Sequence, residues 1–153
     1  MGYRNVMSTS APPADPRSED GIELHRLVEE QAALRRVATL VASGAPSAEV
    51  FTAVAREVAE LMHLPAVALF RYHGDGLMTV IATWSDRPYV FQPGTQWPVD
   101  GQTTVAQIQQ TGRPARVEDY TDLVGPLAAR ARESGLKATA GAPIIVNNSV
   151  WGA

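Results

Sequence analysis

The sequence of 153 residues contains no cysteine. This excludes disulfide bonds, cysteine-ligated zinc, iron–sulfur clusters, thiol redox chemistry and chromophores attached through a thioether. Lysine is nearly missing too, because Lys137 is the single lysine among 13 basic residues. The net charge is −3 and no block of like charge occurs. A nucleic acid is therefore not expected as the main partner, since phosphate binding needs clustered basic side chains.

Long apolar runs are also missing. No stretch approaches the roughly 18 to 20 apolar residues of a membrane span, and the N-terminus lacks the apolar core of a secretory signal. The sequence predicts a cytoplasmic protein without a membrane partner. Its length and its hydrophobic share of 45% fit one globular domain with a core of its own.

The motifs of common enzymes are not found. The chain has no Gly-x-Ser-x-Gly motif, no phosphate-binding Gly-x-x-x-x-Gly-Lys-Ser/Thr loop and no Gly-x-Gly-x-x-Gly motif. A small acidic cluster is formed by Glu118, Asp119 and Asp122. Hard metal ions are usually coordinated by more oxygen ligands than these three residues supply, arranged in a defined loop. We interpret the cluster as a solvated loop, with a metal site as the alternative. The prediction is a protein that is not an enzyme and has no metal, and no cofactor is identified.

The N-terminal part is predicted to be a disordered tail over residues 1–20, followed by a domain over 21–153. A helix is predicted from Ile22 to Ser43. Along it an apolar seam recurs every seven residues, comprising Leu27, Leu34 and Val41 with Leu24, Gln31 and Ala38 three positions ahead. Two interpretations stay open: the seam packs on the domain's own second helix, or it joins two copies as a homodimer.

The remaining pattern alternates between short helices and strands. A second helix is predicted from an N-cap at Ser47 to Met62. Strands follow over Ala66–Tyr72 and Leu77–Trp84, joined by a tight hairpin at His73–Gly76. Beyond a long loop, the predicted elements are a helix at Thr103–Gln110, a strand at Ala115–Asp119, a helix from Pro126 to near Gly135, a strand at Lys137–Val146, a turn at Asn147-Asn148 and a strand from Val150.

A family resemblance rests on the second half of this order. Thr111-Gly112-Arg113-Pro114, the strand-like Ala115-Arg116-Val117, an Ala- and Arg-rich helix and Ala140-Gly141-Ala142-Pro143-Ile144-Ile145-Val146 resemble a GAF domain. The resemblance covers about Leu24 to Ala153. It implies an α+β, PAS-related fold with a central antiparallel sheet. The N-terminal helices would lie on one face, and short helices and loops would roof a pocket on the other.

The resemblance implies a small-molecule-sensing or regulatory module of a bacterial signal-transduction protein, with its ligand unidentified. The likeness is greatest to input modules of actinobacterial sensor histidine kinases of two-component systems. Members that act as methionine sulfoxide reductases or attach bilins need cysteine, and the cyclic-nucleotide pattern does not surround Lys137. His25, His63 and His73 fall outside the roof, where haem-binding members place their histidine.

The ligand-pocket candidates are the aromatic residues of the long loop and the residues of the short helix after it: Trp84, Tyr89, Phe91, Trp97, Gln102, Val105 and Ile108. Apolar walls with one or two polar groups are typical of small-molecule sites. The same aromatics also fit a loop that simply packs on its own sheet.

Two other functions remain open: a ligand-free dimerisation or scaffolding domain, and a non-functional fragment of a longer sensor kinase. Family chains continue past the position of Ala153 with the rest of the last strand and a helix. We therefore expect a domain that is incomplete at this end, with its last strand beside its first near the middle of the sheet.

Overall fold

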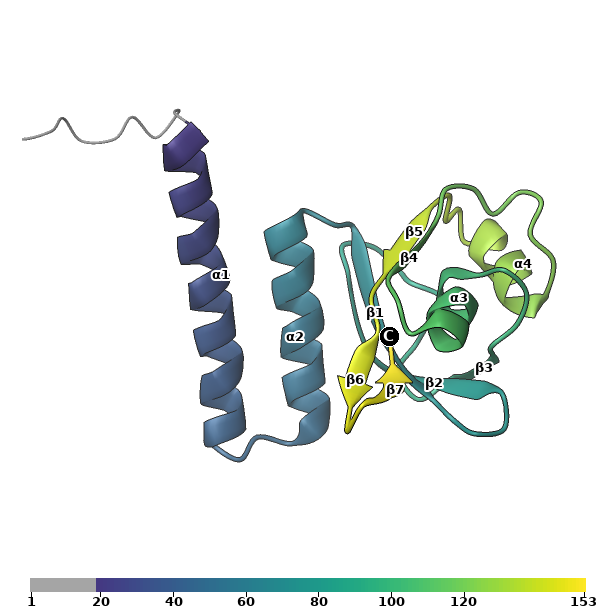
Figure 1. The fold of residues 1–153 in the computed structure, drawn as a ribbon, viewed down its shortest axis with the longest axis horizontal. Helices are drawn as coiled ribbons and strands as arrows, with labels where there is room; N and C mark the ends of the chain where they lie inside the picture. Colours follow the sequence, from purple (N-terminus) through teal and green to yellow (C-terminus); the bar gives the residue numbers. More distant parts are fainter. Residues whose placement is uncertain (1–18) are drawn as a thin grey trace, which may run out of the picture. The chain divides into compact units, whose positions relative to one another are not determined.

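The computed structural model describes residues 19–153. They fall into two units, one ending at Arg36 and one running from Val37 to Ala153, and each is described by itself. Helix α1 spans Glu19–Ala42 (Figure 1). The predicted tail over residues 1–20 lies outside the described residues, except that Glu19 and Asp20 belong to α1.

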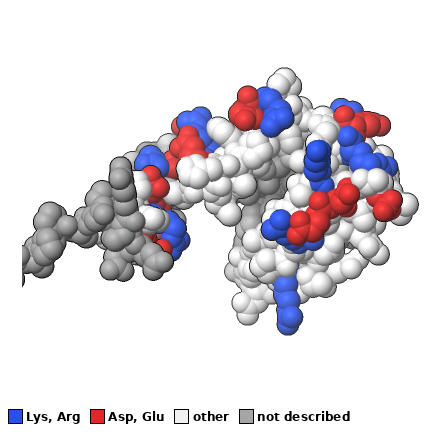
Figure 2. Space-filling model, turned by 90° about the horizontal axis from the view of Figure 1, so that it is seen from above, with Lys and Arg blue, Asp and Glu red and all other residues white. Residues whose placement is uncertain are grey.

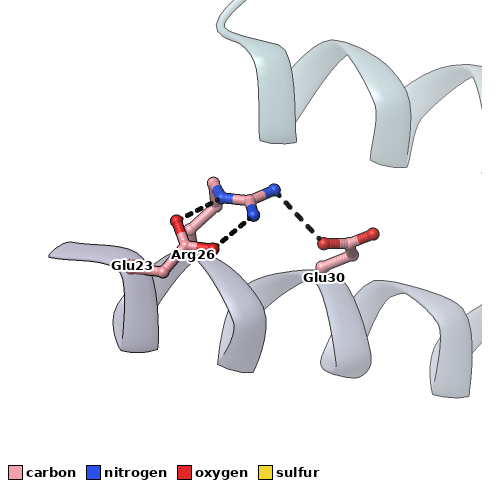
Figure 3. Close-up of polar contacts among 3 residues, drawn as sticks. All are labelled: Glu23, Arg26 and Glu30. Atoms are coloured by element: carbon pink, nitrogen blue, oxygen red, sulfur yellow. Dashed lines mark hydrogen bonds and ion pairs between the residues drawn. The ribbon is translucent and has the colours of Figure 1, made fainter. Parts of the chain in front are cut away.

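Helix α1 carries charged pairs along its exposed surface. Arg26 forms ion pairs with Glu23 at 2.7 Å and with Glu30 at 3.5 Å (Figure 3). Exposed pairs at this spacing stabilise a helix only slightly. The seam residues Leu24, Leu27, Leu34 and Val41 are 44% to 60% exposed, and Gln31 and Ala38 are exposed as well.

Helix α2 spans Ser47–Met62 and covers one face of the sheet by packing on the first two strands. Ser47 was predicted as its N-cap, but Pro46 holds that position and makes no side-chain cap. The carbonyl of Pro46 instead accepts from the N–H groups of Glu49 at 2.9 Å and Val50 at 3.2 Å, which closes the first turn. The helix ends at His63 in the left-handed conformation.

The main sheet is antiparallel, with strands in the order β3-β2-β1-β7-β6 (Figure 1). Its strands are β1 (Ala66–Tyr72), β2 (Leu77–Ser85), β3 (Gln96–Pro98), β6 (Ile144–Val146) and β7 (Ser149–Gly152). Strands β4 (Ala115–Val117) and β5 (Thr139–Gly141) form a separate pair. The last strand lies beside the first and inside the sheet, as predicted.

Two strands depart from the predictions. Strand β3 lies in the stretch predicted as a loop and has three residues, too few for an alternating pattern. The single strand predicted over Lys137–Val146 is two strands, because β5 pairs with β4 whereas β6 pairs with β7. Pro143 stands between them, where its missing N–H group suits the break. Asn147 and Asn148 adopt positive φ in the predicted turn.

A β-bulge divides β2. Leu69 lies opposite Ala82, but the next residue, Phe70, lies opposite Val80, so Ile81 is an extra residue in β2. Side chains of directly opposed residues share a face of the sheet. Beyond the bulge, Trp84 is opposed to Val67, on the face covered by α2, whereas Phe70 and Val80 point to the other face.

That other face is roofed by two short helices, α3 (Thr104–Thr111) and α4 (Pro126–Glu133) (Figure 1). The main core lies between this roof and the sheet, around the buried residues Met78, Val80, Phe91 and Leu127. A smaller core around Val117, Tyr120, Ala128 and Ala131 fixes α4 to β4 and the loop after it. The α+β architecture with a roofed sheet face is therefore confirmed.

Candidate functional site

Four aromatic rings meet beneath the roof. Phe91, which is 4% exposed, makes edge-to-face contacts with Phe70, Tyr89 and Trp97, at centroid distances of 5.9, 5.5 and 5.3 Å. This is the geometry that aromatic pairs prefer, because the positive edge of one ring meets the negative face of another. We call these four residues the aromatic cluster.

The aromatic cluster packs against side chains from the sheet and from the roof helices. Met78 and Val80 come from β2, Leu127 comes from α4, and Val105 comes from α3. Trp97 is placed by the ladder between β2 and β3, in which it lies opposite Met78. Its indole N–H donates to the hydroxyl of Thr95 at 3.0 Å. The rings therefore lie where the sheet, the long loop and both roof helices meet.

Two tyrosine hydroxyls lie at this interface. The Tyr72 hydroxyl donates to the carbonyl oxygen of Val105 at 2.6 Å and thereby ties β1 to α3. Burial raises the pKa of Tyr72 well above its usual range. Burial also raises the pKa of Tyr89 to about 12, with a smaller contribution from Tyr120. Both hydroxyls are thus neutral at physiological pH and able to donate a hydrogen bond.

A chain of three hydroxyls connects the roof to β5. The hydroxyl of Thr139 lies 2.5 Å from that of Thr104 and 2.7 Å from that of Tyr120. Arg132 of α4 donates to the carbonyl oxygens of Tyr120 at 2.9 Å and Leu123 at 2.5 Å. The loop before α4 is therefore held by hydrogen bonds to Thr139 of β5 and to Arg132 of α4. These bonds pair polar groups that would otherwise lack a partner.

The structure brings together four of the predicted site residues: Tyr89, Phe91, Trp97 and Val105 all pack in or against the main core. Ile108 is fully buried, but it approaches Gly141 of β5. Gln102 is exposed, and its carbonyl accepts from the side chain of Gln107 at 2.8 Å. Trp84 is not brought to the cluster, because the bulge turns it to the face under α2.

Several residues of this region were not predicted to belong to a site: Phe70, Tyr72, Val99, Asp100, Thr104, Tyr120, Leu127 and Thr139. Phe70 and Tyr72 occupy alternate positions of β1, so the period of two in that strand could have indicated that they share a face. The others come from loops, helix ends and the start of the three-residue strand β5, where the sequence offers no comparable signal.

The acidic cluster makes local contacts. Asp119 accepts hydrogen bonds from the backbone N–H and the hydroxyl of Thr121 at 2.8 and 2.6 Å, and these bonds lower the pKa of Asp119. Glu118 pairs with Arg116 at 2.8 Å. Within residues 19–153 no three His, Asp or Glu side chains converge as a metal site would require.

Charges of both signs are interspersed on one face of the molecule. On the face drawn in Figure 2, basic and acidic groups lie next to one another, with no broad patch of one sign. A surface of this kind does not attract a polyanion strongly. Among the helices in the described part of the chain, none combines the length and the apolar character that crossing a bilayer demands.

An antiparallel sheet roofed by two short helices in this way defines a small α+β domain. The family model for the GAF domain matches residues 47–153, and the chain belongs to the GAF domain family. The sequence has no significant match among curated proteins.

Solved structures share the fold at low sequence identity. A phycoerythrobilin-bound GAF domain from a cyanobacterial phytochrome has a TM-score of 0.63 at 19% identity, over 82% of this chain and 79% of that one. The A. aeolicus nlh2 GAF domain in an inactive state has a TM-score of 0.62 at 14% identity, over 83% and 77%. The GAF domain of an Acinetobacter phosphoenolpyruvate-protein phosphotransferase has a TM-score of 0.57 at 14% identity, over 80% and 72%.

Proposed function

We propose that this chain is a cytoplasmic, non-catalytic sensory module that binds a small apolar or aromatic ligand between the sheet and the α3–α4 roof. The observation that carries the proposal is the aromatic cluster, in which rings from β1, β3 and the long loop meet under two short helices. Rings with a few polar groups at the rim are the usual lining of small-molecule sites. A bilin-bound domain of the same fold holds its ligand in a GAF domain, but this chain has no cysteine for a thioether bond.

The direct test is a thermal-stability screen against a panel of metabolites. A ligand that binds the folded state alone raises the melting temperature by mass action, and the rise grows with concentration. We expect at least one apolar or aromatic compound to do so. A cooperatively melting protein that shows no shift across a broad panel would contradict the proposal.

Tryptophan fluorescence locates the binding. Trp97 belongs to the aromatic cluster, whereas Trp84 lies on the face under α2 and Trp151 contacts Phe51 of α2. In the double variant Trp84→Phe, Trp151→Phe, Trp97 is the sole indole. A ligand at the proposed site should change its emission, and a matched variant that retains Trp84 alone should show no change.

A second proposal concerns the partner. We propose that α1 joins two copies in a parallel homodimer, as in the input region of a sensor histidine kinase. The dimer would form with or without a ligand in the proposed site. The exposed seam at heptad spacing favours it. In a parallel pair, Glu30 of one copy would face Arg35 of the other, because these positions flank the seam in successive heptads, five residues apart.

Sedimentation equilibrium tests the dimer. Leu34 belongs to the seam and is 59% exposed, whereas Ile22 is 60% exposed and lies on the opposite side of the heptad. Leu34→Gln should weaken self-association by about tenfold or more, since a buried leucine contributes roughly 1.5–3 kcal/mol per copy. Ile22→Gln, the matched control, should leave it unchanged. Equal association of both variants would refute the seam as the interface.

A further inference from the structure

Asp100 lies at the point where the roof helices begin. It follows β3 and Val99, and Val99 packs against the main core. The carbonyl oxygen of Asp100 accepts from the hydroxyl of Thr103 at 3.0 Å, and Thr103 is fully buried at the start of α3. The backbone of Asp100 is thus fixed between the aromatic cluster and α3.

The carboxylate of Asp100 is pressed against the start of α4. Gly125 precedes Pro126 of α4 with φ of 110°, and an added Cβ there would stand 2.4 Å from Oδ2 of Asp100. A side chain at position 125 would therefore displace the carboxylate. Leu127, two residues after Gly125 in the chain, packs in the main core.

The other carboxylate oxygen has no partner. Oδ1 of Asp100 is completely buried, and it is the single buried side-chain N or O atom among the described residues that makes no hydrogen bond. An unpaired buried acceptor is strongly unfavourable, and more so when it is charged. Neither α3 nor α4 has a side-chain N-cap. Their N-terminal partial charges favour an anion here, but they do not satisfy Oδ1.

We propose that Oδ1 of Asp100 is the polar anchor of the ligand site, and that the ligand is an organic amine with an aromatic or other apolar ring body. The protonated amine donates to Oδ1 in a charge-assisted hydrogen bond. Its ring body lies on the aromatic cluster, whose faces also attract a cation. This inference rests on the proposed sensory function and names the chemical class that the same site takes.

Three probes share an indole ring and differ in the charge of their side chain, so they distinguish a need for positive charge from binding through the ring alone. Tryptamine carries a protonated amine, 3-ethylindole is neutral, and indole-3-propionate carries a carboxylate. Binding is measured on the full chain by calorimetric titration and by thermal shift. We expect saturable binding of tryptamine, weaker binding of 3-ethylindole by about tenfold or more, and the weakest binding for indole-3-propionate.

Two variants test the residue. Asp100→Asn keeps the shape but removes the charge, and should weaken tryptamine binding by about tenfold or more without weakening that of 3-ethylindole. Asp86→Asn removes the same charge from an exposed aspartate beside Arg87 and should leave both affinities unchanged. The probe series on the parent protein remains decisive if Asp100→Asn does not fold.

The proposal is overturned if tryptamine does not bind, if indole-3-propionate binds at least as tightly, or if Asp100→Asn keeps the parent affinity. If other compounds of the metabolite panel bind while these tests fail, the sensory function stands and the amine class is wrong. If no compound of the panel binds, the sensory function fails as well.

Discussion

Gly152 of β7 lies so close to β1 that an alanine there should separate the two strands. An added Cβ would stand 2.1 Å from the carbonyl oxygen of Phe70 and 3.4 Å from the Cα of Arg71. Phe70 and Ala153 exchange two backbone hydrogen bonds beside this contact, of 2.8 and 3.0 Å. Because non-bonded heavy atoms pack at about 3.5 Å or more, Gly152→Ala must move the two backbones apart by more than about 1 Å. Both hydrogen bonds then exceed bonding distance.

The magnitude follows from those two bonds. Each contributes a net 0.5–1.5 kcal/mol in a typical protein, so we expect Gly152→Ala to lower the free energy of unfolding by about 1–3 kcal/mol. For a chain of this length, that corresponds to a fall of roughly 2–12 °C in melting temperature. Urea unfolding followed by tryptophan fluorescence and by circular dichroism measures it. Trp151, next to the substituted residue, reports the strand directly.

Gly74→Ala is the matched control. Gly74 lies in the β1–β2 hairpin, has no positive φ, and an added Cβ there would meet nothing within 4 Å. That variant should unfold within about 0.5 kcal/mol of the parent, as surface substitutions usually do. A Gly152→Ala protein as stable as Gly74→Ala would refute the close approach of β7 to β1.

Three further outcomes are expected. Thr139→Val should lower the free energy of unfolding in urea by about 1–3 kcal/mol, because the buried hydroxyls of Thr104 and Tyr120 lose their shared partner. Since the pKa of Tyr89 is raised to about 12 from an unfolded value near 10, stability should hold below pH 10 and fall as pH rises from about 10 through about 12. Tyr89→Phe should reduce that fall in urea titrations at stepped pH, and an unchanged pH profile would contradict it. Arg132→Met should lower stability by about 1 kcal/mol, because two loop carbonyls lose an exposed donor, and an unchanged urea midpoint would show that these bonds contribute nothing.

The elements that could be predicted are those whose signal is local. The apolar period of α2, the apolar run of β1 and the turn at Asn147-Asn148 each depend on residues within one element. The place of the last strand beside the first followed from the family resemblance, which compares whole chains. Strand β3 was missed because three residues cannot show a period, and the break at Pro143 depends on which strand each half pairs with.

Trp84 shows what a single strand cannot reveal. The alternation of β2 alone puts Trp84 on the same face as Met78 and Val80. The bulge at Ile81 reverses that assignment for every residue after it, and it exists only in the register with β1. Asp100 was missed for a related reason, since the lack of a partner for Oδ1 depends on the approach of Gly125 from a distant segment.

The packing of the aromatic cluster also limits how a ligand can bind. Phe91 is nearly inaccessible and makes three edge-to-face contacts, each contributing on the order of 0.5–1.5 kcal/mol. A ligand body must therefore displace a ring, and Tyr89 is the ring most readily moved because it belongs to the loop and not to a strand. Displacing one such contact lowers the apparent affinity by roughly twofold to tenfold relative to an open site. The same displacement changes what α4 packs against, because Leu127 belongs to that core. Under the proposed function, a ligand at this packed site would therefore change the packing of α4, and a ligand shifts a two-state equilibrium only through such a difference between the states.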